Sequence, residues 1–211
     1  MKIKILSFVS ILFLLVIGLT FADDRSVSYR PVANPQPTAT AEKIEVIEFF
    51  WYGCPHCYSL EPGLDAWIEN IPGDVRFRRL PAVLAQNWLP LARAYFVAEK
   101  LGIVDKIHRP LFDAIHRDGE HMNDINNLKK FFAGFGVDED EFVRIYESSE
   151  LQDQIKLAYI AGQKFGITGV PTLIVNGKYM TSPSIAGGIN ATFEALNSLI
   201  EKERPKSAAS E

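Results

Sequence analysis

The pattern of apolar and polar positions divides the chain into sheet-forming and helix-forming regions. Residues 44–51 are β-branched and aromatic, which is typical of a strand buried on both faces of a sheet. A Gly-Cys-Pro sequence at 53–55 interrupts this run, and a helical pattern continues from there to the Pro-Gly pair at 72–73. Residues 75–80 alternate between apolar and polar and predict a second strand. Such a strand–helix–strand opening indicates an α/β fold.

The middle of the chain has the period of amphipathic helices, with apolar residues three or four positions apart. We expect helices whose apolar stripes span residues 91–101, 104–115, 125–132, 142–146 and 151–165. Gly102 and Gly166 are suited to end the first and the last of them, and Pro110 is expected to kink the second. Asn123 or Asp124 can cap the third.

The sheet pattern returns near the C-terminus. Residues 172–175 and 178–180 are short strand-like runs, and the Asn176-Gly177 pair between them is a strong hairpin signal. A last amphipathic helix follows over residues 193–200. Two sheet-forming regions that flank a block of helices predict one α/β domain with an inserted all-helical domain.

We expect the following boundaries: 44–87 and 166–203 for the two parts of the α/β domain, 88–165 for the helical insertion, 23–43 for an extended lead-in and 204–211 for a flexible tail. The lead-in is polar and proline-bearing, and its residues 29–32 are a candidate edge strand.

The N-terminus has the layout of a secretory signal peptide. Two lysines precede an apolar run over residues 5–21, and small residues at 20 and 22 stand before two aspartates. We therefore expect residues 1–22 to be a cleaved signal. The alternative is a retained membrane anchor, which normally needs about 20 apolar residues. This run is a little shorter and ends at a plausible cleavage site.

Composition narrows the function classes. The formal net charge is −4, and no cluster of Lys and Arg suggests nucleic-acid binding. The only cysteines are Cys54 and Cys57. Closing so short a loop removes little chain entropy, about 2 kcal/mol in the loop-closure model, so the pair is a poor structural staple. We interpret it as reactive chemistry.

The position of Cys54 favours thiol–disulfide exchange. It stands where a strand turns into a helix, so its sulfur can face the free N–H groups and partial positive charge of the helix start. His56 lies in the same turn and adds a cation beside that sulfur when it is protonated. Both effects favour the thiolate, and a pair with a stabilised reduced form is a strong oxidant. The predicted direction is oxidation of client thiols.

Zinc binding and haem attachment are weaker explanations. Structural zinc usually needs two further Cys or His ligands, whereas no other cysteine exists and the remaining histidines lie in the helical block. Haem attachment requires a histidine directly after the second cysteine, where this chain has Tyr58. We expect no metal.

A second candidate element is Val170-Pro171-Thr172. Pro171 could simply start an edge strand. The functional interpretation is a cis peptide bond in a loop that faces the cysteines, where the flanking backbone pairs with an extended substrate segment. The combination with Cys-Pro-His-Cys favours the functional interpretation.

Glu48 is the third candidate, because a carboxylate in a buried strand is costly. One possibility is that it leans toward the strand end and solvent. The other is that it lies behind Cys57 with a raised pKa and relays protons during exchange. Glu45, on the same strand, is expected at the surface.

These motifs resemble those of the DsbA family of bacterial periplasmic oxidases. Residues 48–57 are Glu-Phe-Phe-Trp-Tyr-Gly-Cys-Pro-His-Cys, and residues 168–179 are Thr-Gly-Val-Pro-Thr-Leu-Ile-Val-Asn-Gly-Lys-Tyr. The resemblance extends from about Tyr29 to Ile200, and Pro-His between the cysteines is far more specific than Cys-x-x-Cys alone. It implies a thioredoxin-like fold with an inserted helical domain.

The resemblance also implies roles for individual residues. Cys54 would be the exposed nucleophile that forms the mixed disulfide, and Cys57 its buried partner. Pro55 and His56 would tune the reactivity of the pair, and Glu48 would be the buried acid. The loop formed by Val170, cis-Pro171 and Thr172 would contact substrate.

The implied partners are exported proteins with free thiols and a quinone-linked membrane protein, similar to DsbB, that reoxidises the pair. The resemblance implies a periplasmic monomer with no cofactor beyond the Cys54–Cys57 disulfide. Two alternatives stay open: a reductase or isomerase on the same fold, and a redox-inert chaperone or binding module that uses the groove beside Pro171.

Overall fold

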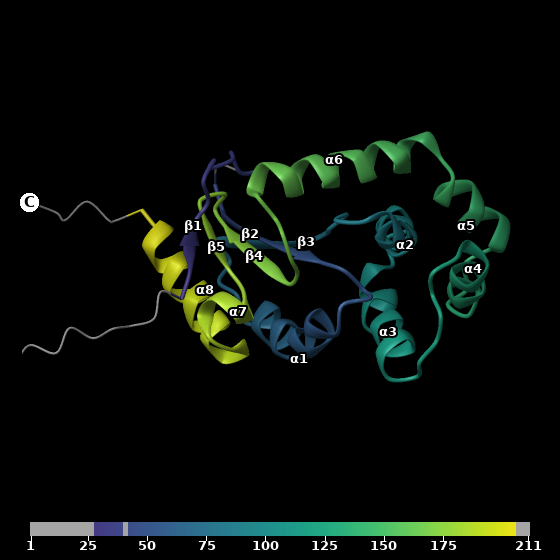
Figure 1. Ribbon diagram of the computed structural model, residues 1–211, viewed down its shortest axis with the longest axis horizontal. Helices are drawn as coiled ribbons and strands as arrows, with labels where there is room; N and C mark the ends of the chain where they lie inside the picture. Colours follow the sequence, from purple (N-terminus) through teal and green to yellow (C-terminus); the bar gives the residue numbers. More distant parts are fainter. Residues whose placement is uncertain (1–27, 40–41, 206–211) are drawn as a thin grey trace, which may run out of the picture.

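The computed structural model describes residues 28–39 and 42–205. The expected signal peptide over 1–22 lies outside these residues, as does most of the expected tail. Figure 1 shows the strands together at one end, with α2 to α5 gathered at the other end and α6 running between the two along one side. Among the described residues, no helix is long and apolar enough to cross a membrane.

The described elements follow the expected order. They are β1 (Arg30–Pro31), β2 (Ile44–Phe50), α1 (Pro55–Glu69), β3 (Val75–Pro81), the short 3-10 helix η1 (Gln86–Trp88), α2 (Leu89–Lys100), α3 (Val104–His116), α4 (Ile125–Ala133), α5 (Glu139–Tyr146), α6 (Ser149–Phe165), β4 (Thr172–Val175), β5 (Tyr179–Thr181), α7 (Pro183–Ala186) and α8 (Ile189–Glu203). Only the short helices η1 and α7 were not expected. Helix α3 runs through Pro110.

The strands form one mixed sheet in the order β1-β5-β4-β2-β3. Strand β2 lies parallel to β3 and antiparallel to β4. Strand β1 pairs with β5 at the far edge, which confirms the edge strand expected in the lead-in. Asn176 and Gly177 have φ values of 49° and 67°, as the tight turn between β4 and β5 requires.

Helices cover both faces of β2, so all seven of its residues are buried. Val46 packs with Leu60 of α1 and with α8, whereas Phe49 points to the other face and meets Phe165 of α6. Side chains alternate along a strand. Glu48 therefore shares the face of Val46 and points toward α1, the helix that begins at the cysteine pair.

The expectation that Glu45 lies at the surface was wrong. Glu45 is only 2% exposed, and its Oε1 lies 3.0 Å from Nε of Arg78. The reason is that β2 is a central strand with both faces covered, so even its polar residues are taken inside and must find partners.

The helical insertion shares its core with the turn that follows β2. The ring of Phe50 lies 5.4 Å from that of Tyr95 on α2, and 5.1 Å and 6.1 Å from those of His108 and Phe112 on α3. Tyr52, in the turn itself, belongs to the same cluster. The insertion is thus packed directly against the segment that leads into the cysteine pair.

Candidate active site

The cysteine pair stands at the junction of β2 and α1. Cys54 is the N-cap of α1, and Pro55 occupies its first turn, where the missing N–H costs nothing. The N–H of Cys54 donates to the carbonyl of Trp51 at 2.9 Å, which closes the turn. Cys57 is one turn further along the helix and is completely buried. Both cysteines are free thiols in this structure.

Cys54 is less exposed than expected, with 8% of its surface accessible. Its sulfur lies 3.5 Å from the carbonyl oxygen of Val170, so the loop after α6 covers it from one side. It remains the more accessible of the two sulfurs, because Cys57 lies inside the core.

The environment lowers the pKa of Cys54 to about 6. The largest cause is a hydrogen bond that the Cys57 thiol donates to the Cys54 sulfur, and burial works against it. The backbone N–H groups of Cys57 and His56 and the charge of the His56 ring lower the pKa further. These are the contacts expected at a helix start, so the thiolate of Cys54 is the stable form near neutral pH.

The pKa of Cys57 is shifted far in the opposite direction. Burial is the main cause, and its hydrogen bond to Cys54 and the nearby Glu48 carboxylate add to it. Two cysteines three positions apart therefore have opposite protonation preferences. This difference favours the thiolate form of Cys54 and the protonated thiol form of Cys57.

The loop before β4 lies against the cysteine pair. The Val170–Pro171 peptide bond is cis, as the functional interpretation predicted. Thr172 begins β4, and its hydroxyl donates to the Gly169 carbonyl at 2.7 Å. A cavity of about 630 Å³ opens beside this loop, lined in part by His56, Val170, Pro171 and Thr172. The helix start and the loop thus both line a single groove.

Glu48 lies in the interior and not at a solvent-exposed strand end. Burial, with the nearby negative charge of Glu61 second, raises its pKa to about 8. Arg79 opposes this shift, with its Nε 3.3 Å from Glu48 Oε2. Neither carboxyl oxygen of Glu48 has a hydrogen-bond partner among the described residues. Glu48 is therefore mainly protonated at pH 7.

Three residues of this buried cluster were not expected: Glu61, Arg79 and His108. Arg79 Nη2 lies 3.0 Å from Oε2 of the fully buried Glu61, and the same oxygen lies 3.2 Å from His108 Nε2. A signal for Arg79 was present in the sequence. If the two predicted strands pair in parallel and start level, position 48 faces position 79, and the structure has this register. No comparable signal pointed to His108.

Two tryptophans stack beside the cysteine turn. The rings of Trp51 and Trp88 are 4.3 Å apart and nearly parallel. A Cβ atom at Gly53 would lie 2.4 Å from the Trp51 ring, so the ring covers this glycine closely. Residue 53 must therefore lack a side chain for the stack to form.

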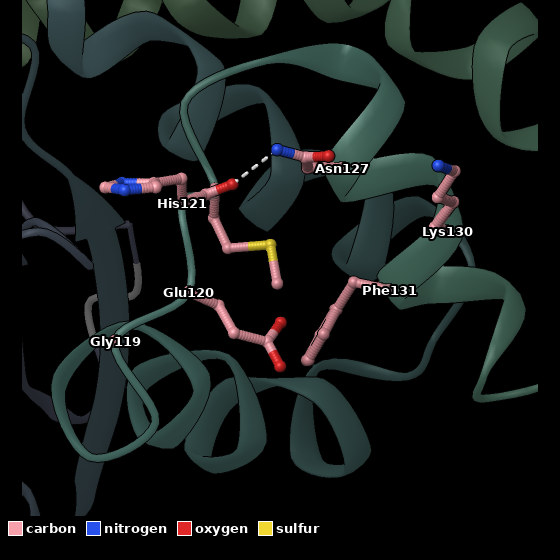
Figure 2. Close-up of a pocket in the computed structure, with 7 residues that line it drawn as sticks. Gly119, Glu120, His121, Asn127, Lys130 and Phe131 are labelled. Atoms are coloured by element: carbon pink, nitrogen blue, oxygen red, sulfur yellow. Dashed lines mark hydrogen bonds between the residues drawn. The ribbon is translucent and has the colours of Figure 1, made fainter.

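A second hollow of about 480 Å³ lies at the loop between α3 and α4, away from the cysteines. In Figure 2, Glu120 and Phe131 point into it, whereas the His121 ring is turned outward. The amide of Asn127 holds the loop by donating to the His121 carbonyl at 2.7 Å. None of the expected site residues lines this hollow. In the part of the chain that the structure describes, no three His, Cys, Asp or Glu side chains are grouped to hold a metal.

Comparison with known proteins gives a consistent family match. The model of the DSBA-like thioredoxin domain matches residues 45–191. The thiol:disulfide interchange protein DsbA of Azotobacter vinelandii is 41% identical over 168 residues, covering 80% of this chain and 78% of that protein. Its namesake in Pseudomonas syringae pv. tomato is 38% identical over 181 residues, or 86% and 85% of the two chains.

Comparison with solved structures gives the same family match. The crystal structure of Pseudomonas aeruginosa DsbA matches with a TM-score of 0.80 at 38% identity, covering 84% of this chain and 92% of that one. The oxidoreductase DsbA from Xylella fastidiosa matches with a TM-score of 0.79 at 35% identity, covering 84% and 95%.

Proposed function

From the premise that this chain belongs to the DsbA family of thioredoxin-fold thiol–disulfide oxidoreductases, we propose how its residues divide the chemistry. The expected fold, the oxidoreductase activity in disulfide formation and the cysteine pair as redox centre follow from the family. The assignment of roles is our proposal. The observation that carries it is the contrast between the lowered pKa of Cys54 and the raised pKa of Cys57.

The oxidised protein acts through its Cys54–Cys57 bond. A client thiolate attacks the Cys54 sulfur, the intramolecular disulfide breaks, and Cys57 leaves with the electron pair and takes up a proton. A second client thiolate then attacks the client sulfur of the mixed disulfide, and Cys54 leaves as its stabilised thiolate. Two electrons pass from the client to the cysteine pair, and the client gains a disulfide.

Glu48 is the proton partner of Cys57 in this scheme. It points toward the helix that carries Cys57, and at pH 7 it holds a proton that it can give to the departing Cys57 thiolate. In the reverse direction, during reoxidation, it accepts the proton of the Cys57 thiol. Pro55 and His56 act on the other sulfur, by fixing the helix start and by favouring the Cys54 thiolate.

The groove beside Val170, Pro171 and Thr172 binds the client. Val170 is half-buried with its carbonyl next to Cys54, so an extended client segment that pairs with this backbone would have its cysteine beside the reactive sulfur. His56 of the helix start and the loop residues both line the groove, so a client chain can cross between them.

The family and the N-terminal pattern support our proposal for the partners and the compartment. Clients are exported proteins with free thiols, met in the periplasm after residues 1–22 have been removed. A quinone-linked membrane protein similar to DsbB reoxidises the pair, and the protein works as a monomer.

The decisive experiment is the redox equilibrium of residues 23–211 against glutathione buffers. We expect the Cys54–Cys57 disulfide to be reduced even in fairly oxidising buffer. A disulfide that survives until conditions are as reducing as thioredoxin requires would refute the oxidase and favour a reductase. Replacing Cys54 by Ser separates the remaining alternative, because a redox-inert chaperone would keep its activity.

A further inference from the structure

Tyr52, two residues before Cys54, is held at both ends by histidines of α3. The Nε2 atom of His116 lies 2.7 Å from the Tyr52 carbonyl oxygen. The Nδ1 atom of His108 lies 2.9 Å from the Tyr52 hydroxyl. The two histidines are eight residues apart, or about two helical turns, so both project from the same side of α3. One helix of the insertion thus contacts both the backbone and the side chain of the active-site turn.

The chemistry of these groups determines where the hydrogens lie. A carbonyl oxygen only accepts, so His116 carries a hydrogen on Nε2 and donates it to Tyr52. His108 is neutral, because burial lowers its pKa. Nε2 of His108 lies 3.2 Å from Oε2 of Glu61. Burial acts to raise the pKa of the Glu61 carboxyl, but contacts with His108 and Arg79 outweigh burial and lower that pKa. The single hydrogen of His108 therefore faces Glu61, and Nδ1 accepts from the Tyr52 hydroxyl.

Helix α3 also contacts the chain on the other side of the cysteine pair. The His116 ring stacks on the ring of Tyr58 at 4.9 Å, with 18° between their planes. The Tyr58 hydroxyl donates to Oδ1 of Asp113 at 2.9 Å, and the Arg109 guanidinium lies 5.0 Å above the Tyr58 ring. Residues 52 and 58 enclose the Cys-Pro-His-Cys segment, so this segment is anchored to α3 before and after the two cysteines.

We propose that His108 and His116 are positioning residues for Cys54: through Tyr52 they fix the turn so that the N–H groups of the helix start stay directed at the Cys54 sulfur. This rests on the proposed function, in which Cys54 is the reacting sulfur. Hydrogen bonds weaken steeply as the donor turns away from the acceptor. A turn that moves freely would therefore stabilise the thiolate less well, and the pair would become less oxidising.

Two substitutions test the two ends of Tyr52 separately. Tyr52→Phe removes only the hydroxyl and leaves the contact of His108 with Glu61 in place. His116→Phe removes the N–H donor but keeps an aromatic ring against Tyr58. The matched control is His121→Phe, because His121 is exposed and its ring points away from the hollow in Figure 2. The measurements are the Cys54 pKa from thiolate absorbance, the equilibrium with glutathione, and thermal unfolding.

We expect Tyr52→Phe and His116→Phe each to raise the Cys54 pKa and to shift the glutathione equilibrium about fivefold toward the disulfide, as the loss of one hydrogen bond would. The control should match the wild type. The proposal is overturned if the folded variants lose thermal stability but keep the wild-type pKa and equilibrium, or if His121→Phe shifts them equally. Should His116→Phe fail to fold, Tyr52→Phe decides alone. A wild type that is itself only weakly oxidising would refute the proposed function instead.

Discussion

Replacing Glu48 by Gln should make the reduced protein more stable at neutral pH. Glu48 is fully buried, and burial raises its pKa from 4.5 to about 8. At pH 7 the unfolded chain carries an ionised Glu48, whereas the folded chain must hold it protonated. Folding therefore includes the cost of binding a proton, and Gln, which is neutral and of similar shape, avoids that cost.

The magnitude follows from the pH interval over which only the folded protein binds the proton. One pKa unit corresponds to about 1.4 kcal/mol, and pH 7 lies two and a half units above 4.5, which gives a cost of roughly 3 kcal/mol. Below pH 4.5 both states are protonated and the cost disappears. As pH rises from 4.5 toward 8, the wild type loses stability relative to the variant, and above pH 8 the difference stays constant.

The assay is urea unfolding of both reduced proteins at several pH values between 4.5 and 8. Cys54 titrates in both, so its contribution largely cancels in the difference. The matched control is Glu45→Gln on the same buried strand, which removes an ion pair with Arg78 and should be destabilising at pH 7. A stability difference between wild type and Glu48→Gln that does not change with pH would refute the reasoning.

Three further outcomes follow from the geometry. Gly177→Ala should lower the free energy of unfolding in urea by roughly 2–4 kcal/mol, because Gly177 has φ +67° and its Cβ would lie 2.0 Å from a backbone oxygen of the lead-in. Gly102→Ala, at the same φ but with open space around it, should cost only about 1 kcal/mol. Equal costs would contradict this. Gly53→Ala should displace the Trp51 ring, which lies 2.4 Å from the new Cβ, and change the tryptophan fluorescence; an unchanged spectrum would contradict this. The pKa of Cys54 is lowered from 9.0 to about 6, so its ionisation should stabilise the reduced protein relative to Cys54→Ser. The difference in the free energy of unfolding should be about 1 kcal/mol at pH 7, larger toward pH 9 and absent well below pH 6. A constant difference over that range would count against the thiolate.

The features that were predicted correctly from the sequence each depend on a few residues that are neighbours along the chain. The hairpin turn at Asn176-Gly177 is one example, and the cap of α4 at Asp124, which accepts from two backbone N–H groups, is another. The cysteine pair and the cis-proline loop were also found, because each is a short motif.

The buried cluster could not be predicted in the same way, because its members meet only through tertiary packing. Glu61 and His108 belong to helices that look amphipathic in isolation, and nothing local shows that their side chains meet between α1 and α3. The exposure of Glu45 was misjudged for the same reason. Whether a polar residue in a strand faces solvent depends on which elements cover the sheet, and that is a property of the whole fold.

The order of the strands has a consequence for how the molecule is assembled. Strand β2 receives its second neighbour from the far end of the chain, where Thr172 lies opposite Phe49. Within the insertion, α4 contacts α5, and α2 contacts α3, α5 and α6, so these contacts all form among residues 89–165. A chain that emerges N-terminus first can therefore pack its insertion while its central strand still lacks β4 and β5, since contacts between distant segments form late. The loop that places Val170 against Cys54 arrives with the last strands, so the groove beside the cysteine pair is completed only at the end of folding.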